Sequence, residues 1–459
     1  MEARGPRGPI DRKAGPTRTI VVVPFRSSDK AEERRSDSSD EARVRRSLEA
    51  RREEAVGLAR AIDLEVIDCI SVKLATLRPA TLIGTGKIDE IKVLILAGEV
   101  ELVIVDHALT PVQQRNLERA WNAKVLDRTG LILEIFGERA RTKEGRLQVE
   151  LAHLNYQKSR LVRSWTHLER QRGGFGFLGG PGETQIEADR RQLQERIAHL
   201  EADLDQVRRT RELHRKNRRK VPHPIVALVG YTNAGKSTLF NLLTRAEVVA
   251  KDLLFATLDP TLRRVMLPHG GEAILSDTVG FVSDLPTHLV AAFRATLEEV
   301  IEADLILHVR DMAHEDAAAQ ADDVTDVLRV LGLDAKDPER FIEVWNKIDK
   351  LDEPAREHML ADGGHGAGKG PASVPVSALT GEGVDRLMTL IEDRLNRDRM
   401  RFRLSVPAAE GALLAWIYRS TEVLSRNDRE ASVDLELRVP PKALDLFRSR
   451  AGKYIRQAG

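Results

Sequence analysis

The stretch IVALVGYTNAGKSTLFNLLT, residues 225–244, decides the fold of this chain. Its central segment GYTNAGKS matches the pattern G-x-x-x-x-G-K-[ST] between an apolar strand and a helical pattern, which disfavours a chance glycine-rich turn. Gly230 and Gly235 allow a tight turn in which successive N–H groups and the next helix N-terminus point at phosphates. Lys236 adds a positive charge between the β- and γ-phosphates, and the Ser237 hydroxyl is a ligand for Mg²⁺. The stretch therefore predicts a nucleoside triphosphate site in an α/β sheet.

A carboxylate motif, DTVG, follows a second apolar run about forty residues later. Asp277 ends a predicted strand, where α/β sheets bind ligands, and is placed to hold the Mg²⁺ shell through water. The Gly280 N–H is placed to sense the γ-phosphate. Phe281 follows where Ras-like enzymes carry a glutamine that orients water, and an aromatic ring cannot do this. We expect slow intrinsic hydrolysis, with water positioned by another group or a docking partner; packing of Phe281 in the core is compatible with this.

Two further motifs predict which base is bound. In FIEVWNKID, Asp349 can accept both adjacent donors on the N1 and N2 edge of guanine, a pair that adenine lacks. Asn346 can donate to the O6/N7 side of the purine, and the stem of Lys347 can cover the face of the base. In VPVSALTGEG, Ser377 is followed by Ala378, whose backbone N–H is a candidate donor to guanine O6. The sequence therefore favours GTP over ATP.

The remaining element is a switch threonine for Mg²⁺ and the γ-phosphate, for which FATLDPT offers Thr257 and Thr261. We favour Thr257, because FATLDP resembles the switch of the Obg-like GTPases. The alternative is that Thr261 is a structural residue of the turn. We assign catalysis to Lys236, Thr257 and Gly280, and Mg²⁺ binding to Ser237 and Thr257. The predicted nucleotide site comprises Gly230, Tyr231, Thr232, Asn233, Ala234, Gly235, Lys236, Ser237, Thr238, Phe255, Ala256, Thr257, Leu258, Asp259, Asp277, Thr278, Val279, Gly280, Asn346, Lys347, Ile348, Asp349, Ser377, Ala378 and Leu379.

Composition limits the remaining possibilities. The 459 residues, 42% of them apolar, are enough for about three domains, and the net charge of +1 gives no global field for nucleic acid or membranes. The single cysteine, Cys69, excludes an internal disulfide and fits a reducing cytosol, so we expect a cytoplasmic protein. No apolar run approaches the roughly 20 residues that span a bilayer, and the N-terminus lacks a secretory signal. We expect a monomer without membrane insertion.

The chain divides by pattern into several regions. Strand candidates at 19–25, 64–70, 81–84, 101–106 and 124–127 alternate with helical patterns and predict a small parallel layer. Two long helices are then expected around the glycine-rich loop 173–183, the second over 184–216 and antiparallel to the first. A surface loop is expected at 361–373. The predicted organisation is a flexible tail (1–17), an N-terminal α/β subdomain (18–128), a helical hairpin (129–222), a GTPase domain (223–398) and a small C-terminal domain (399–459).

Four stretches carry a wider resemblance: VLDRTGLILEIFGERARTKEGRLQVELAHL (125–154), RLVRSWTHLERQRGGFGFLGGPGETQIEADRR (160–191), GYTNAGKSTLFNLLT and FATLDPTLRR. Over about residues 18–455 the chain resembles the HflX family of P-loop GTPases. The resemblance implies a multidomain α/β fold: a GTPase domain with a mostly parallel sheet and helices on both faces, and a small α/β domain on either side. It implies GTP hydrolysis that is slow alone and stimulated by the ribosome, and association with the large ribosomal subunit to split or rescue stalled ribosomes. The family loop often reads GGxGxRGPGE, and Leu178 and Gly179 here leave out its arginine.

The helical region suits ribosomal RNA. Residues 208–220 hold eight basic side chains and one acid, a net charge of +7, and further basic residues surround an aromatic stacking surface. Solvated basic faces and a tryptophan in the core are the alternative. Rival functions are a GTP-regulated RNA-remodelling protein and a non-ribosomal GTP-sensing scaffold. The predicted RNA-binding residues are Arg163, Trp165, Arg170, Arg172, Gly174, Gly176, Arg215, Arg218 and Arg219.

A second glycine-containing segment, GTGKIDE at 84–90, resembles a minor nucleotide-binding loop but lacks the first glycine of the phosphate-binding pattern. Phosphate contact there would give the N-terminal region an ATPase activity, which the family resemblance also suggests. We favour a turn followed by the start of a helix.

Overall fold

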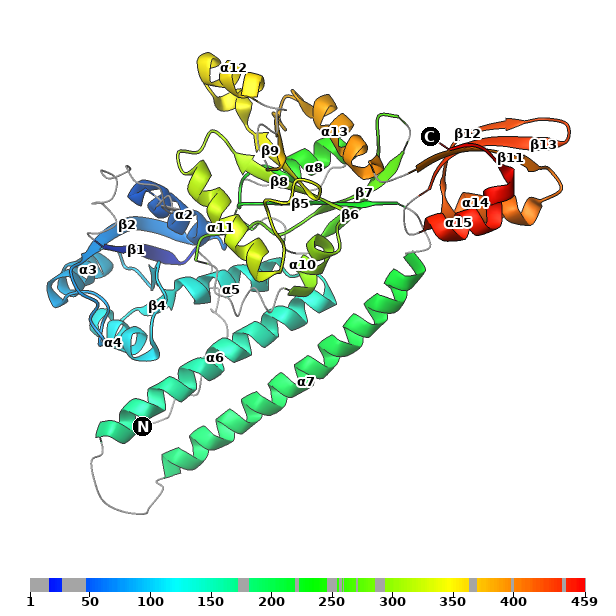
Figure 1. Ribbon diagram of the computed structural model, residues 1–459. Coiled ribbons are helices and arrows are strands. Elements are labelled where there is room, and N and C mark those ends of the chain that lie inside the picture. Colours follow the sequence, from blue (N-terminus) through cyan, green and yellow to red (C-terminus); the bar gives the residue numbers. More distant parts are fainter. Residues whose placement is uncertain are drawn as a thin grey trace. The chain divides into compact units, whose positions relative to one another are not determined.

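The computed structural model describes residues 16–26, 47–171, 181–218, 223–245, 254–255, 258, 260–269, 271–284, 294–362, 370–397, 400–439 and 443–458 (Figure 1). These residues fall into two compact units. The first contains the described residues of Met1–Ala202, Lys251–Ala256 and Asp284–Phe293. The second contains those of Asp203–Ala250, Thr257–Ser283 and Arg294–Gly459.

The first unit is built on a four-stranded parallel sheet. Its central strand reads Ile20-Val21-Val22-Val23, and these side chains are fully buried, as expected of a strand covered on both faces. The strand order is β2-β1-β3-β4, which confirms the predicted small parallel α/β layer. Its elements are β1 (Arg18–Arg26), α2 (Leu48–Arg60), β2 (Glu65–Leu74), α3 (Thr85–Ala97), β3 (Leu102–Val105), α4 (Pro111–Trp121) and β4 (Lys124–Asp127).

The strand expected at 81–84 is wrong. Leu82 adopts the left-handed conformation with φ of 67°, and its backbone exchanges two hydrogen bonds with Arg78. Gly84 then precedes the first residue of α3. The two apolar residues of this segment, Leu82 and Ile83, therefore form a turn into a helix, because a left-handed residue cannot continue a strand.

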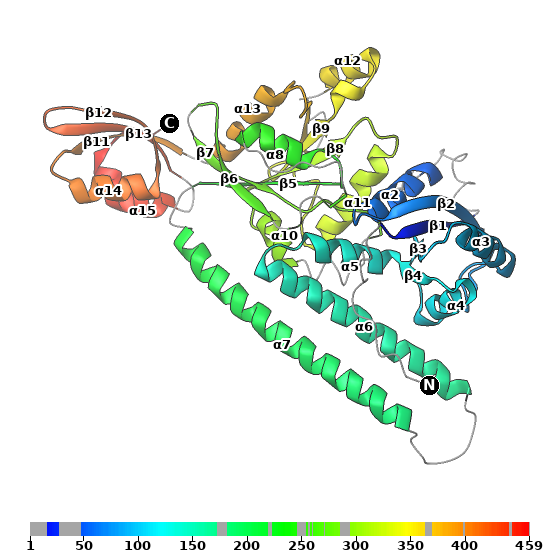
Figure 2. The same cartoon turned by 180° about the vertical axis from the view of Figure 1, so that it is seen from behind.

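The described residues of the helical region form three helices rather than the two that were expected: α5 (Arg128–Arg139), α6 (Lys143–Gln171) and α7 (Pro181–Arg218). The chain becomes extended at Ala140, and the Thr142 hydroxyl then accepts from Gly145 N at 3.0 Å to cap α6. Helices α6 and α7 lie side by side and antiparallel in both views (Figures 1 and 2), and Arg196 pairs with Glu150 at 2.7 Å. The antiparallel arrangement agrees with the prediction. Of the predicted glycine-rich loop, residues 181–183 belong to α7 and the rest lies outside the described residues.

The second unit holds a six-stranded sheet in the order β10-β9-β8-β5-β7-β6, parallel except for the β6–β7 pair. Helices α8 and α13 pack on one face through Leu239, Phe240 and Leu387, and Figure 1 shows α10 and α11 on the other face. The predicted mostly parallel sheet with helices on both faces is confirmed. Its elements are β5 (Ile225–Gly230), α8 (Lys236–Thr244), β6 (Thr261–Met266), β7 (Glu272–Asp277), α10 (Arg294–Ile301), β8 (Leu305–Asp311), α11 (Ala317–Val330), β9 (Phe341–Asn346), η2 (Ile348–Lys350), α12 (Glu353–Asp362), β10 (Ala372–Pro375) and α13 (Val384–Asn396).

The same unit ends in a small domain with an antiparallel sheet of order β12-β13-β11-β14, which confirms the predicted α/β C-terminal domain. Its core includes Phe402, Leu404, Ile417 and Phe447. In the loop expected at 361–373, residues 361–362 end α12, residues 372–373 begin β10, and 363–369 lie outside the described residues. The elements are β11 (Met400–Pro407), α14 (Gly411–Ser420), β12 (Glu422–Asp428), β13 (Ser432–Val439), α15 (Leu444–Ala451), η4 (Gly452–Tyr454) and β14 (Ile455–Ala458).

A buried carboxylate ties the helical region to the sheet of the first unit. Asp127 ends β4 and is 2% exposed. It caps α5 by accepting from Gly130 N at 2.9 Å, and it also accepts from Leu109 N, the Tyr156 hydroxyl and Arg160 Nη2. Burial and the charge of Asp127 raise the pKa of Tyr156, so the phenol stays protonated and donates a hydrogen bond to the carboxylate. One carboxylate therefore joins β4, the start of α5 and the middle of α6.

We expect Asp127→Asn to destabilise the first unit by about 3 kcal/mol, because the partly buried Arg160 guanidinium, 18% exposed, then loses its buried counter-ion. Denaturant unfolding measures this change. Asp89→Asn on the exposed face of α3 is the matched control and should stay within about 0.5 kcal/mol of the parent. A stability loss in Asp127→Asn as small as that of the control would contradict the role of this carboxylate in joining β4, α5 and α6.

Candidate nucleotide-binding site

Four of the predicted motifs meet at the carboxyl edge of the six-stranded sheet. There β5, β7 and β9 end, and β10 leads into Ser377-Ala378-Leu379, here called the SAL segment. The loop after β5 requires a glycine immediately before α8. Gly235 has φ of 92°, and a Cβ there would lie 2.2 Å from Asn346 Nδ2. A side chain at this position would therefore collide with the end of β9.

Lys236 is buried at the first turn of α8. Its Nζ donates to the Tyr231 carbonyl at 2.7 Å and to the Gly230 carbonyl at 3.1 Å. Burial lowers the pKa of Lys236 to about 8, although the negative charge of Asp277 opposes the shift. An anionic ligand would favour the charged form and reverse this shift.

Ser237 and Asp277 form the oxygen-rich part of the site. Ser237 Oγ donates to Asp277 Oδ2 at 2.8 Å, and Asp277 is fully buried at the end of β7. A hydroxyl and a carboxylate are hard oxygen donors, which Mg²⁺ prefers. Among the described residues, no group of three or more His, Cys, Asp or Glu could hold a metal. The residues present therefore fit a Mg²⁺ ion bound chiefly through water and phosphate oxygens.

Gly280 lies directly against the phosphate-binding loop. A Cβ at Gly280 would lie 2.9 Å from Thr232 Cα and 3.0 Å from Lys236 Nζ, so the close approach needs glycine. Phe281 beside it is 1% exposed, which confirms that its ring packs in the core. The ring cannot orient water, as the sequence indicated.

On the predicted base-binding side, Asn346 has a different role from the one expected. Its Nδ2 donates to the Ala234 carbonyl at 2.8 Å, and its Oδ1 accepts from Ala378 N at 3.0 Å. The two donors expected for guanine, Asn346 and the Ala378 N–H, are thus engaged within the protein, and Asn346 instead braces the phosphate loop against the SAL segment. Sequence reasoning missed this brace; the signal was an amide directly at the end of a buried strand.

The groups next to Asn346 remain well placed for a base. Asp349 Oδ1 accepts from Ser377 Oγ at 2.6 Å, which fixes the carboxylate. Lys347 adopts φ of 66° and its Nζ pairs with Asp311 at 2.7 Å, which holds its stem in place. Leu379 is 77% exposed, and its backbone N–H has no recorded partner among the described residues. The Leu379 N–H is the next backbone donor along the chain after the Ala378 N–H, which already donates to Asn346.

The predicted switch segment is described only in part. Thr257, Ala256 and Asp259 lie outside the described residues. Phe255 belongs to the first unit, where its ring meets Phe136 of α5 edge to face with centroids 4.8 Å apart. Thr261, the other candidate, is the first residue of β6 and pairs in register with Asp277. Thr261 is therefore a strand residue rather than a turn residue.

The predicted RNA-binding residues are placed only by their backbones. Arg163, Trp165 and Arg170 lie on α6, and Arg215 and Arg218 lie on α7, with side chains outside the described set. Arg172, Gly174, Gly176 and Arg219 fall outside the described residues altogether. The RNA-binding surface stays a prediction.

The GTGKIDE segment forms the beginning of α3. Gly84 takes the N-cap position without a capping side chain, and Lys87 Nζ pairs with Glu90 at 2.5 Å. The turn and helix start that we favoured are what this segment forms, and phosphate contact there is untested. In the part of the chain that the structure describes, no helix is long and apolar enough to cross a membrane.

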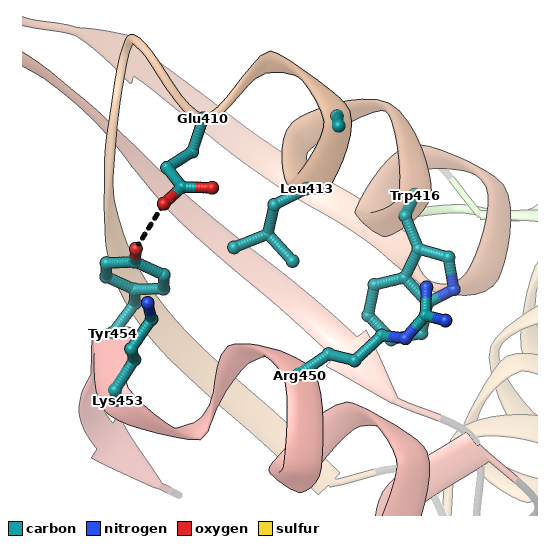
Figure 3. A pocket seen from close by; sticks show the side chains of 7 residues that line it. Glu410, Leu413, Trp416, Arg450, Lys453 and Tyr454 are labelled. Carbon is teal, nitrogen blue, oxygen red and sulfur yellow. Dashed lines mark hydrogen bonds between the residues drawn. The ribbon is translucent and has the colours of Figure 1, made fainter.

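A separate hollow lies in the C-terminal domain between α14 and the α15–η4 segment (Figure 3). Its volume is about 240 Å³. The Arg450 guanidinium lies 5.2 Å from the centre of the Trp416 ring, and the Tyr454 hydroxyl donates to Glu410 at 3.0 Å. The polar groups of this hollow mainly interact with one another, so the site chemistry concentrates at the edge of the six-stranded sheet.

Comparison with known proteins covers most of the chain. Residues 49–137 match a family described as the N-terminal region of GTP-binding GTPases, and residues 139–218 match their middle region. Residues 225–347 match a family described as 50S ribosome-binding GTPase, and residues 365–458 match the HflX C-terminal domain.

A GTPase HflX of Magnetococcus marinus is 50% identical over 393 residues, covering 85% of this chain and 88% of that protein. A GTPase HflX of Escherichia coli is 44% identical over 391 residues, covering 84% and 89%. A crystal structure of a Sulfolobus solfataricus GTP-binding protein with GDP aligns over 83% of this chain and 99% of that one, with 22% identity and a TM-score of 0.43. With two HflX proteins matching along most of its length and residues 365–458 matching the HflX C-terminal domain, the chain belongs to the HflX family of GTPases.

Proposed function

We propose that this protein hydrolyses GTP to GDP and phosphate, and that its GTP-bound form associates with the large ribosomal subunit to split or rescue stalled ribosomes. It acts in the cytoplasm as a monomer. The observation that carries the hydrolytic part is the convergence of Lys236, the Ser237–Asp277 pair and Gly280 at one sheet edge. The ribosomal part is supported by the match of residues 225–347 to a family described as 50S ribosome-binding GTPases.

Hydrolysis needs no protein nucleophile, because water attacks the γ-phosphorus and GDP leaves. Lys236 is held at the first turn of α8, where its charge can stabilise the oxygens between the β- and γ-phosphates. Gly280 approaches Lys236 closely, and its N–H would donate to the γ-phosphate. Ser237 and Thr257 would hold Mg²⁺, with Asp277 acting through water, and the bound ion would neutralise phosphate charge.

Base selection follows from the fixed carboxylate of Asp349. Because Ser377 Oγ already donates to one oxygen, the carboxylate enters base recognition in a set orientation. Guanine supplies two donors side by side for such a carboxylate, and adenine would leave it unpaired. A binding-site acceptor left without its donors discriminates against the ligand that lacks them.

We expect guanine nucleotide affinity to fall as pH rises through the pKa of Lys236, which is about 8. Below that pH the ammonium is charged and attracts phosphate; above it the neutral amine does not. Between pH 7 and 8.5 the affinity should fall about fourfold, measured by calorimetric titration. The Lys236→Ala variant should bind more weakly but without this slope, and a slope retained in that variant would assign the titration to another group.

Asp349→Asn should lower GTP affinity at least about a hundredfold and raise the relative affinity for XTP. Xanthine presents a carbonyl in place of the guanine N2 amino group, so it suits an amide better than a carboxylate. Competition binding with GTP, XTP and ATP measures the change. The control is Asp322→Asn at an exposed position of α11. An unchanged order of nucleotide affinities in Asp349→Asn would refute guanine recognition by this residue.

Co-sedimentation with separated ribosomal subunits tests the ribosomal part. The protein should pellet with large subunits in a non-hydrolysable GTP analogue and much less in GDP, and large subunits should accelerate its GTP turnover. Replacing Arg215, Arg218 and Arg219 by Ala should weaken binding and flatten its salt dependence. The control replaces Arg263, Arg264 and Arg329, which are exposed on the second unit. Equal co-sedimentation with GDP and with the GTP analogue, or no co-sedimentation with either, would favour the alternative functions as a scaffold or an RNA-remodelling protein.

A further inference from the structure

The tyrosine of the phosphate-binding loop forms a bond that nucleotide binding does not explain. The Tyr231 side chain is 4% exposed, and its hydroxyl accepts from the backbone N–H of Ser283 at 2.7 Å. A phenylalanine would fill the same apolar space, so packing alone does not call for the hydroxyl. Its specific effect is on the segment that follows the DTVG motif.

Two backbone bonds join the same two segments. Phe281 N donates to the Gly230 carbonyl at 3.1 Å, and Thr232 N donates to the Phe281 carbonyl at 2.7 Å. Tyr231 and Phe281 thereby form a parallel bridge, which extends the pairing of β5 beyond the end of the strand. Together with the tyrosine hydroxyl, three hydrogen bonds fix residues 281–283 alongside the phosphate loop.

The hydroxyl acts at the point where the chain leaves this unit. Ser283 belongs to the second compact unit, and the next residue, Asp284, belongs to the first and adopts φ of 48°. The Ser283 N–H is therefore the last of the three attachments before the chain leaves. Removing it would leave the two backbone bonds of Phe281 as the hydrogen bonds described here between this segment and the phosphate loop.

We propose that Tyr231 is a positioning residue for recognition of the γ-phosphate. By holding Ser283 it keeps Phe281 in register with the phosphate loop, and so sets the direction of the Gly280 N–H, whose backbone lies against Thr232 and Lys236. The inference rests on the proposed GTPase function and assigns to Tyr231 an effect on triphosphate that diphosphate does not share. Preorganisation of the donor lowers the cost of ordering it when the γ-phosphate is bound.

The test compares two ligands on the full-length Tyr231→Phe variant, which keeps the ring and removes the acceptor. Affinities for GDP and for the β,γ-imido analogue of GTP are measured with Mg²⁺, together with kcat and KM for GTP. The affinity for the triphosphate analogue should fall roughly three- to tenfold, the range for one hydrogen bond, and the affinity for GDP should stay within about twofold. The matched control, Tyr418→Phe, removes an exposed hydroxyl of the C-terminal domain and should change neither affinity.

Two outcomes would overturn the proposal. Equal losses of affinity for GDP and for the triphosphate analogue, with a lower Tm, would show that Tyr231 has only a structural role. Unchanged affinities would show that the hydroxyl does not position Gly280. Failure of the proposed function gives a different result, because the parent protein would then bind ATP as tightly as GTP. In that event the affinities of Tyr231→Phe are compared for ADP and the imido analogue of ATP instead.

Discussion

The nucleotide site depends on one buried amide. Asn346 ends β9 with 1% of its surface exposed, donates to the carbonyl of Ala234 and accepts from the N–H of Ala378. These bonds connect the phosphate loop, the NKID motif and the SAL segment, which come from three separate parts of the chain. Because each bond is buried, loss of the amide would leave two backbone groups without partners. The amide also explains why position 235 admits only glycine, since its nitrogen occupies the space of a Cβ.

The sequence was informative where a motif's chemistry is local. The phosphate loop, Asp277 and Asp349 each follow an apolar strand, and a parallel sheet brings strand ends to one edge, so their convergence could be predicted. The role of Asn346 could not, because NKxD shows that an amide is present but not which backbone groups reach it. The failed strand at 81–84 has a related cause: its β-forming residues are overridden by the left-handed Leu82, which only the surrounding fold requires. The break at Ala140 was missed because helical periodicity continues on both sides, although Thr142 offered a capping signal.

Burying the charge of Lys236 has a cost that the site offsets only in part. Two backbone carbonyls solvate the ammonium, yet its pKa is lowered to about 8, so the charged form is less stable here than in water. Phosphate oxygens would stabilise that charge better than carbonyl groups, since they carry full negative charge. Part of the binding free energy thus comes from relieving an unfavourable burial, and a surface lysine could not supply this contribution.

Both segments expected to respond to the γ-phosphate cross between the two compact units. Phe255 is packed in the first unit, whereas Leu258 belongs to the second; Ser283 belongs to the second, whereas Asp284 belongs to the first. We expect a triphosphate that orders these segments to act on parts of the chain that also run into the N-terminal unit. In both segments the chain itself is a covalent connection between residues of the two units.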